Sequence, residues 1–159
     1  MNNNYWKSCG SYTDINFEKS NEGIAKITIN RPEVRNAFRP LTVREMRAAL
    51  NDAREDTKIG VIILTGEGEK AFCAGGDVVM LYHSMQETAE GEVPAKAHEF
   101  FTKEYQLDQT IHTYPKPVII YADGIVMGGG LGVAAAGSHR IVTERSMIAM
   151  PEVTIGLYP

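Results

Sequence analysis

The strongest constraint on the fold is a pattern that occurs twice: a short continuous apolar run, a glycine-rich turn, and then a helical stretch. The first copy has the run 61–64 and the glycines 75–76, and a helical stretch can start at residue 78. The second copy has the run 118–121 and the glycines 128–130. Continuous apolar runs of this length are typical of parallel strands that are buried between helices. The repetition predicts an α/β fold with a parallel sheet.

The remaining elements follow from local patterns. Residues 15–29 alternate apolar and polar side chains around a polar turn, which predicts a hairpin. Thr42 and Glu45 have the spacing of a capping box, and apolar residues recur after them at helical intervals. A second helix is expected over 95–112, after a polar connection. These elements belong to one α/β domain without internal repeats of fixed period.

Composition excludes several functional classes. The chain has 159 residues, 43% of them hydrophobic, and a formal charge of −4, which suits one globular domain. No run approaches the roughly 20 apolar residues of a membrane span, so we expect no membrane partner. Sixteen basic residues are intermixed with 20 acidic ones, which argues against a nucleic-acid partner. Cys9 and Cys73 have no metal-ligand or disulfide spacing, so we expect no metal and a cytoplasmic location.

The two glycine-rich segments, 71–77 and 127–130, can carry chemistry. Glycine permits close backbone approach, and an amide at a helix start has no partner inside its helix. Two such turns can aim two N–H groups at one oxygen and form an oxyanion hole, where each donor is worth about 3 kcal/mol to a transition state. The alternative is that these glycines only let a helix pack closely on a strand.

Glu152 is the third candidate. Pro151 fixes the backbone just before it, so the carboxylate can be held against a pocket as a general acid or base. The alternative is a solvated surface glutamate, which is the commonest environment of this residue type.

Taken in order, the segments 71–77, 127–130 and 149–153 resemble the crotonase (enoyl-CoA hydratase/isomerase) superfamily, and the resemblance extends over about 17–159. It implies a crotonase-like spiral of ββα turns. It also implies an acyl-CoA thioester substrate in which coenzyme A is part of the substrate, no permanently bound cofactor, and trimers or hexamers of the full-length form.

The resemblance also assigns residues. The amides of Gly76 and Gly129 match the pair that holds the thioester carbonyl in the family. Arg35 and Lys70 resemble positions near the phosphates of coenzyme A, although solvated surface charge is an equally good interpretation, and Ala74 is placed with them in the coenzyme A site.

Different parts of the chain resemble different subfamilies. Residues 1–77, above all 27–42, resemble 1,4-dihydroxy-2-naphthoyl-CoA synthases. Residues 78–159, above all 149–159, resemble 3-hydroxyisobutyryl-CoA hydrolases. We expect either a mosaic with a seam near residue 77 or a hydrolase-like chain with a divergent front half.

The catalytic positions favour hydrolysis. Glu152 matches the acid of the hydrolases and hydratases, whereas the position of the second hydratase carboxylate is Gly132 here. In the hydrolases the pattern continues beyond Pro159 into an aspartate, so residues 1–159 are expected to be the N-terminal part of one domain. We expect this part to lack the C-terminal helices and to hydrolyse its thioester substrate weakly or not at all.

Three alternative functions stay open. They are naphthoate synthase activity, enoyl-CoA hydration, and a non-catalytic module that binds acyl-CoA or a protein partner.

Overall fold

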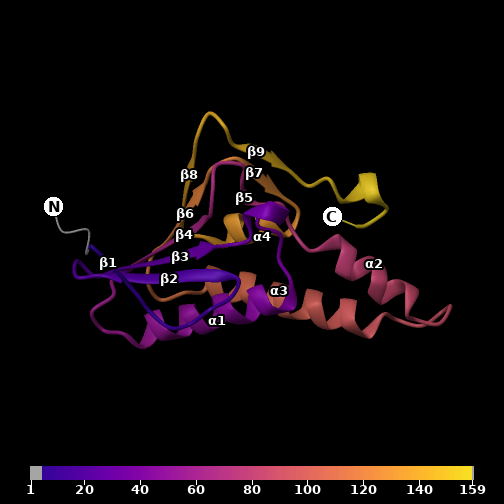
Figure 1. Cartoon of the computed structure of the whole chain (residues 1–159), viewed down its shortest axis with the longest axis horizontal. Coiled ribbons are helices and arrows are strands. Elements are labelled where there is room, and N and C mark those ends of the chain that lie inside the picture. Colours follow the sequence, from indigo (N-terminus) through magenta and orange to yellow (C-terminus); the bar gives the residue numbers. More distant parts are fainter. Residues whose placement is uncertain (1–4, 159) are drawn as a thin grey trace.

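The computed structural model describes residues 5–158, which form two sheets (Figure 1). The larger sheet has the strand order β1-β2-β3-β4-β6-β8, and the smaller one has the order β5-β7-β9. The strands of the larger sheet are β1 (Trp6–Ser8), β2 (Ile15–Ser20), β3 (Ile24–Ile29), β4 (Val61–Gly66), β6 (Val118–Ala122) and β8 (His139–Val142). Those of the smaller sheet are β5 (Ala71–Cys73), β7 (Ile125–Met127) and β9 (Met147–Ala149).

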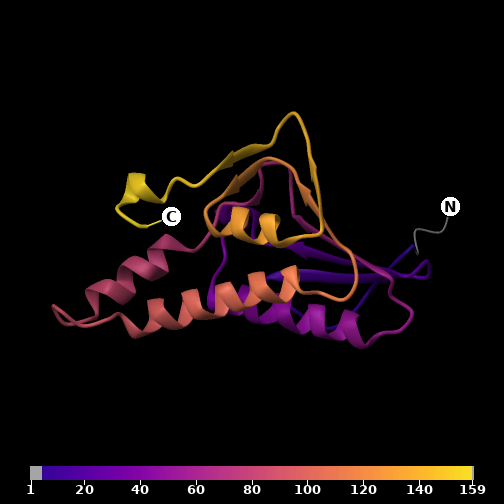
Figure 2. The ribbon, with the colours of Figure 1, turned by 180° about the vertical axis from the view of Figure 1, so that it is seen from behind.

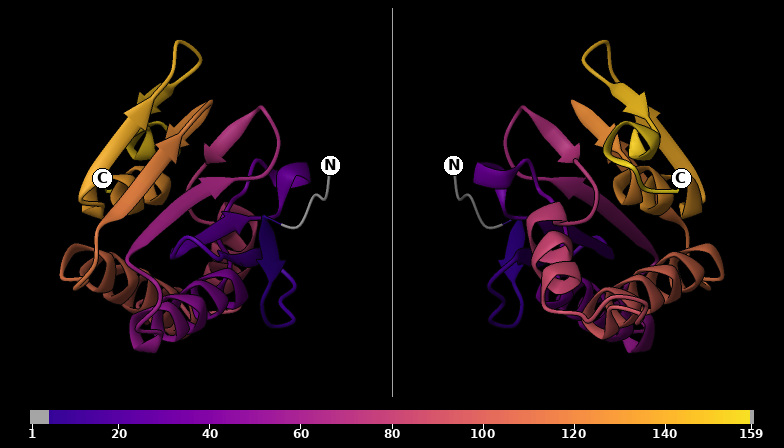
Figure 3. Two further views of the ribbon diagram at one scale, coloured as in Figure 1. Left: turned by 90° about the vertical axis from the view of Figure 1, so that its left-hand side faces the viewer. Right: turned by 90° about the vertical axis from the view of Figure 1, so that its right-hand side faces the viewer.

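The chain repeatedly forms one strand of the larger sheet, then one strand of the smaller sheet, and then a helical segment. β4 and β5 precede the helices α2 and α3, β6 and β7 precede α4, and β8 and β9 precede a 3-10 turn (Figure 3). The helical segments are η1 (Pro32–Val34), α1 (Pro40–Glu55), α2 (Val78–Gln86), α3 (Ala95–His112), α4 (Gly129–Ala136) and η2 (Glu152–Ile155). This repetition is the predicted ββα spiral, and the α/β class is confirmed.

Strand pairing agrees with the sequence patterns. β2 and β3 form the predicted antiparallel hairpin, and β3, β4, β6 and β8 pair in parallel. The helix expected over 95–112 has these bounds in the structure. One detail is corrected: in β4 only Ile62 and Leu64 are buried, while Val61 and Ile63 are partly exposed, so the strand is closely covered on one face and not on both.

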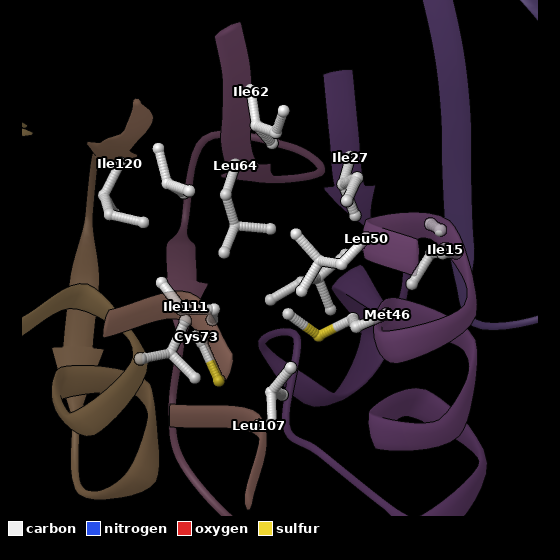
Figure 4. Packing of buried hydrophobic residues seen from close by; sticks show 14 of the residues in the cluster. Ile15, Ile27, Met46, Leu50, Ile62, Leu64, Cys73, Leu107, Ile111 and Ile120 are labelled. Carbon is white, nitrogen blue, oxygen red and sulfur yellow. The ribbon is translucent and has the colours of Figure 1, made fainter. Parts of the chain in front are cut away.

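The core lies between the larger sheet and the helices α1 and α3, which run side by side along it (Figure 1). In the close view, Met46 and Leu50 of α1 lie near Ile27 of β3, and Leu107 and Ile111 approach from α3 (Figure 4). All five side chains are buried. Because burial of such a side chain contributes about 1.5–3 kcal/mol, this layer fixes the positions of the strand ends.

The predicted capping box is wrong. Helix α1 already begins at Pro40, so Thr42 lies in its first turn, and the Thr42 hydroxyl donates to Asp14 Oδ2 over 2.6 Å. The Glu45 carboxylate accepts hydrogen bonds from the backbone amides of Thr13 and Asp14 instead of from its own helix start. Thr42 Oγ1 also accepts from the Arg39 amide over 3.1 Å, so the local cap pairs Thr42 with Arg39 and not with Glu45, which binds the segment before β2 instead.

The segment 139–158 differs from the rest because none of its residues is buried. β8 and β9 are the outer strands of their sheets, and their apolar side chains face outward. The exposed apolar side chains of this segment are Ile141, Val142, Met147, Ile148, Met150, Val153, Ile155 and Tyr158. Within residues 5–158, no helix is both long and apolar enough to cross a bilayer.

Candidate active site

The two glycine turns are in direct contact. Gly75 has a φ of +98°, and a side chain there would meet the Met127 carbonyl oxygen at 3.0 Å and the Gly129 nitrogen at 3.3 Å. The first turn is held by Phe38, whose amide donates to the Gly75 carbonyl while its carbonyl accepts from the Asp77 amide, each over 2.8 Å. Glycine is therefore required at residue 75 both by its backbone conformation and by the closeness of the second turn.

The Gly76 and Gly129 amides flank one small cavity of about 90 Å³. Gly129 is the first residue of α4, so its N–H has no acceptor inside the helix. Within residues 5–158, neither amide donates a hydrogen bond to a protein acceptor. The arrangement leaves two backbone donors free beside the same space, which is what an oxyanion hole requires.

Glu152, the first residue of η2, faces this cavity. Its Oε1 atom lies 2.7 Å from the point where a Cβ on Gly128 would stand. Its Oε2 atom is buried and has no hydrogen-bond partner among the described residues. The carboxylate therefore lies against the glycine turn rather than in open solvent, although it belongs to the exposed C-terminal segment.

Two further carboxyl groups at the site were not predicted from the sequence. Glu104 of α3 is only 4% exposed, and its Oε1 atom lies 1.7 Å from the position of a Cβ on Gly129, so only glycine fits there. Burial, with smaller contributions from the charges of Asp108 and Glu152, raises the pKa of Glu104 to about 7. Burial also raises the pKa of Asp108 to about 6.

A signal for Glu104 is present in the sequence. The buried face of α3 carries Phe100, Leu107 and Ile111, and Glu104 stands on the same face at helical spacing. A carboxylate on an apolar face is rarely buried without a functional or structural partner. The position of Glu104 on that stripe could have identified it, whereas nothing in the sequence pairs Asp108 with the C-terminal segment.

A larger cavity of about 430 Å³ adjoins the first one. It lies between α3, the start of α4 and the C-terminal segment, which occupy the same side of the molecule (Figure 2). Glu104, Asp108 and Glu152 line it together with apolar side chains that include Phe101 and Met150. The site therefore combines two backbone donors with three carboxyl groups, two of which lie directly against the glycine turns.

The residues expected to bind coenzyme A lie close to the first turn. Arg35 and Lys70 line a separate cavity of about 170 Å³, so the structure brings these two cations together. Ala74 lines the oxyanion cavity instead, and its amide donates to the Arg35 carbonyl over 3.0 Å. Glu67 and Glu69 line the cavity of Arg35 and Lys70 as well, so the two cations face two carboxylates there. The binding role of Arg35, Lys70 and Ala74 stays a prediction.

Neighbouring polar groups have structural roles. Asp77 Oδ1 accepts from the Met80 amide over 3.3 Å, so Asp77 caps α2. Cys73 is fully buried, and burial raises the pKa of its thiol, which keeps it protonated and unsuited to nucleophilic attack. Among the described residues, no group of three or more His, Cys, Asp or Glu side chains is arranged to hold a metal ion.

Known proteins resemble this chain in sequence and in fold. The family model described as enoyl-CoA hydratase/isomerase matches residues 24–159. The chain is 38% identical over 153 residues to "3-hydroxyisobutyryl-CoA hydrolase, mitochondrial" of Gallus gallus, covering 96% of this chain and 38% of that protein. It is 40% identical over 136 residues to "Small ribosomal subunit protein mS47" of Neurospora crassa, covering 86% of this chain and 26% of that protein.

Among solved structures, a carnitinyl-CoA dehydratase from Mycobacterium thermoresistibile superimposes with a TM-score of 0.83 at 42% identity, covering 92% of this chain and 41% of that one. The chain thus spans well under half the length of these relatives. The Gallus gallus protein is mitochondrial by name, so the cytoplasmic location stays a prediction. The match to the family model, the sequence identities and the shared fold lead to one conclusion: the chain belongs to the enoyl-CoA hydratase/isomerase family.

Proposed function

We propose that this chain is the acyl-CoA-binding part of a thioester hydrolase that resembles the 3-hydroxyisobutyryl-CoA hydrolases. The observation that carries the proposal is the convergence of two unpaired amides, at Gly76 and Gly129, with the Glu152 carboxylate on one cavity. The 38% identity to a hydrolase supports the choice of reaction.

In the proposed mechanism the thioester carbonyl oxygen accepts hydrogen bonds from the Gly76 and Gly129 amides. As a nucleophile adds to the carbonyl carbon, these donors stabilise the negative charge that develops on the oxygen. The contribution comes from backbone that the core holds in place, so no reorganisation is needed during the reaction.

Glu152 supplies the nucleophile by one of two routes. It removes a proton from a water molecule whose oxygen adds to the carbonyl carbon, or it attacks that carbon directly and forms an anhydride that water then opens. In the first route the C–S bond breaks as Glu152 passes the proton taken from water to the sulfur of coenzyme A. In the second route the sulfur leaves as a thiolate, which takes a proton from solvent water, and a second water opens the anhydride. Arg35 and Lys70 bind phosphate groups of coenzyme A by charge complementarity.

Hydration of an alkene is the weaker alternative because Gly132 offers no side chain at the position of the second hydratase carboxylate. Naphthoate synthase activity stays an alternative because residues 1–77 resemble that subfamily. Identification of the reaction product distinguishes hydrolysis, hydration and naphthoate synthesis. Assembly of full-length chains into trimers or hexamers is part of the same proposal.

The test is release of free thiol from 3-hydroxyisobutyryl-CoA by the wild-type chain, by Glu152→Gln, and by Glu144→Gln as a matched control on an exposed glutamate of the same segment. We expect slow release by the wild type and the control, and about 100-fold or greater loss in Glu152→Gln. Equal thiol release by the wild type and Glu152→Gln would contradict the proposal.

A second candidate function is a non-catalytic module that binds a protein partner. It is favoured by the exposed apolar side chains of residues 141–158 and by the 40% identity to a protein that is named as a ribosomal subunit. Binding of acyl-CoA without thiol release, with the same affinity in Glu152→Gln, would support this candidate over hydrolysis.

A further inference from the structure

The larger cavity is the space into which the acyl group of a bound thioester would extend. It shares Gly129, Glu104 and Glu152 with the small cavity of the two free amides, so the two spaces adjoin. It shares no lining residue with the cavity of Arg35 and Lys70. Three carboxyl groups and no Lys or Arg line it, so it does not suit phosphate groups and faces the other end of the substrate.

Asp108 also lines this cavity. Its Oδ1 atom is buried and has no hydrogen-bond partner among the described residues. Its Oδ2 atom lies 3.0 Å from the point where a Cβ on Gly132 would stand, so the missing side chain of Gly132 leaves room beside the carboxyl group. A buried acceptor without a donor is unusual in a folded protein and indicates a group that a ligand supplies.

Glu104 gives an independent indication that the cavity takes a ligand. It is nine-tenths or more buried, it lines the same cavity, and residues 5–158 provide no hydrogen-bond partner for its carboxyl group. Glu104 lies against Gly129, beside the expected position of the carbonyl oxygen. Asp108 stands four residues later on α3, about 5–6 Å further along the helix, which suits a substituent a few bonds from the carbonyl.

We propose that Asp108 is a specificity-determining residue that accepts a hydrogen bond from a hydroxyl group on the acyl chain of the substrate. This inference rests on the proposed function and adds that the acyl pocket selects substrates with a hydroxyl group on the acyl chain. A neutral hydroxyl suits the pocket because burial favours the uncharged forms of Glu104 and Asp108, and a carboxyl oxygen accepts a hydrogen bond in either protonation state. The apolar side chains of Phe101 and Met150 surround the carbon skeleton.

The test compares two ligands that differ only in the hydroxyl group, 3-hydroxyisobutyryl-CoA and isobutyryl-CoA. Their dissociation constants are measured by titration calorimetry on the full chain carrying Glu152→Gln, which blocks turnover. We expect the hydroxylated ligand to bind about tenfold more tightly, the discrimination that one additional hydrogen bond provides. Adding Asp108→Leu should reduce the ratio to below about twofold.

Two further variants sharpen the result. Asp108→Asn keeps an acceptor oxygen at the same place and should retain the discrimination, and Gln109→Leu is the matched control on an exposed position of α3. Discrimination that survives Asp108→Leu, or equal binding of both ligands to the parent, would overturn the role of Asp108 and leave the proposed function standing. Failure of both ligands to bind would overturn the proposed function and this inference with it.

Discussion

The oxyanion turns and Glu152 belong to two regions that are held in place by different forces. Every buried apolar side chain of the described residues lies between Ile15 and Ala134, and the glycine turns are fixed within that region. The segment 139–158 that carries Glu152 has no buried residue and is ordered by strand pairing, β8 with β6 and β9 with β7. Hydrophobic burial positions the backbone donors, whereas backbone hydrogen bonds at two sheet edges position the acid.

This difference predicts that the same substitution destabilises the two regions to very different extents. Ile62 in β4 is 0% exposed and Ile148 in β9 is 53% exposed, and both lie in parallel strands. Ile62→Ala should lower the free energy of unfolding by about 2–5 kcal/mol because it leaves a cavity in the core. Ile148→Ala should change it by less than about 0.5 kcal/mol. Urea denaturation measures both values, and a similar loss in the two variants would show that the C-terminal segment packs against a core of its own.

A second prediction concerns Glu104, the buried acid that faces Glu152. Its pKa rises from 4.5 to about 7 on folding, so between these pH values the folded chain holds a proton that the unfolded chain has released. The free energy of unfolding should therefore fall as pH rises from 4.5 to 7 and level off above 7, a contribution of about 3 kcal/mol.

Glu104→Gln should remove this slope, and Glu99→Gln, on an exposed position of α3, should retain it. Denaturant titrations at several pH values provide the measurement. Parallel curves for wild type and Glu104→Gln would mean that the carboxyl group is solvated in the folded chain.

The smallest effect is expected at the polar link between α1 and the segment before β2. Glu45 accepts hydrogen bonds from the amides of Thr13 and Asp14, with distances of 2.7–3.1 Å. Glu45→Ala should cost about 1–3 kcal/mol because it leaves these amides without an acceptor, whereas Glu55→Ala at the exposed end of α1 should cost less than about 0.5 kcal/mol. Equal midpoints of thermal unfolding in the two variants would contradict this role for Glu45.

Much of the fold could be predicted because it depends on local patterns. The hairpin β2–β3, the strand β4 and the helix α3 follow from apolar periodicity and turn residues that are read along the chain. The predicted pairing of Thr42 with Glu45 failed because the Glu45 carboxylate binds the amides of Thr13 and Asp14, which are distant in sequence. A local capping pattern cannot reveal a competing partner of that kind.

The candidate site likewise has features that the sequence reveals and features that depend on tertiary packing. The two glycine turns stand out in the sequence because Gly75 and Gly128 have positive φ angles that favour glycine, whereas the roles of Gly76 and Gly129 come from the family resemblance and stay a prediction. Glu104 was not predicted although it stands on the apolar face of α3, and Asp108 could not be predicted because it reaches the cavity only after α3 packs against α4. The seam near residue 77 stays a prediction.

The sequence by itself determined the order of strands, turns and helices, the two glycine turns, and the family to which these motifs belong. It did so because backbone conformation and apolar periodicity are encoded over a few neighbouring residues. Only the tertiary structure decided that the two turns touch, that Glu152 faces them, and that Glu104 and Asp108 complete an acidic pocket. The physical reason is that these contacts join segments far apart in the chain, and burial, which no local pattern specifies, sets the pKa values of Glu104 and Asp108.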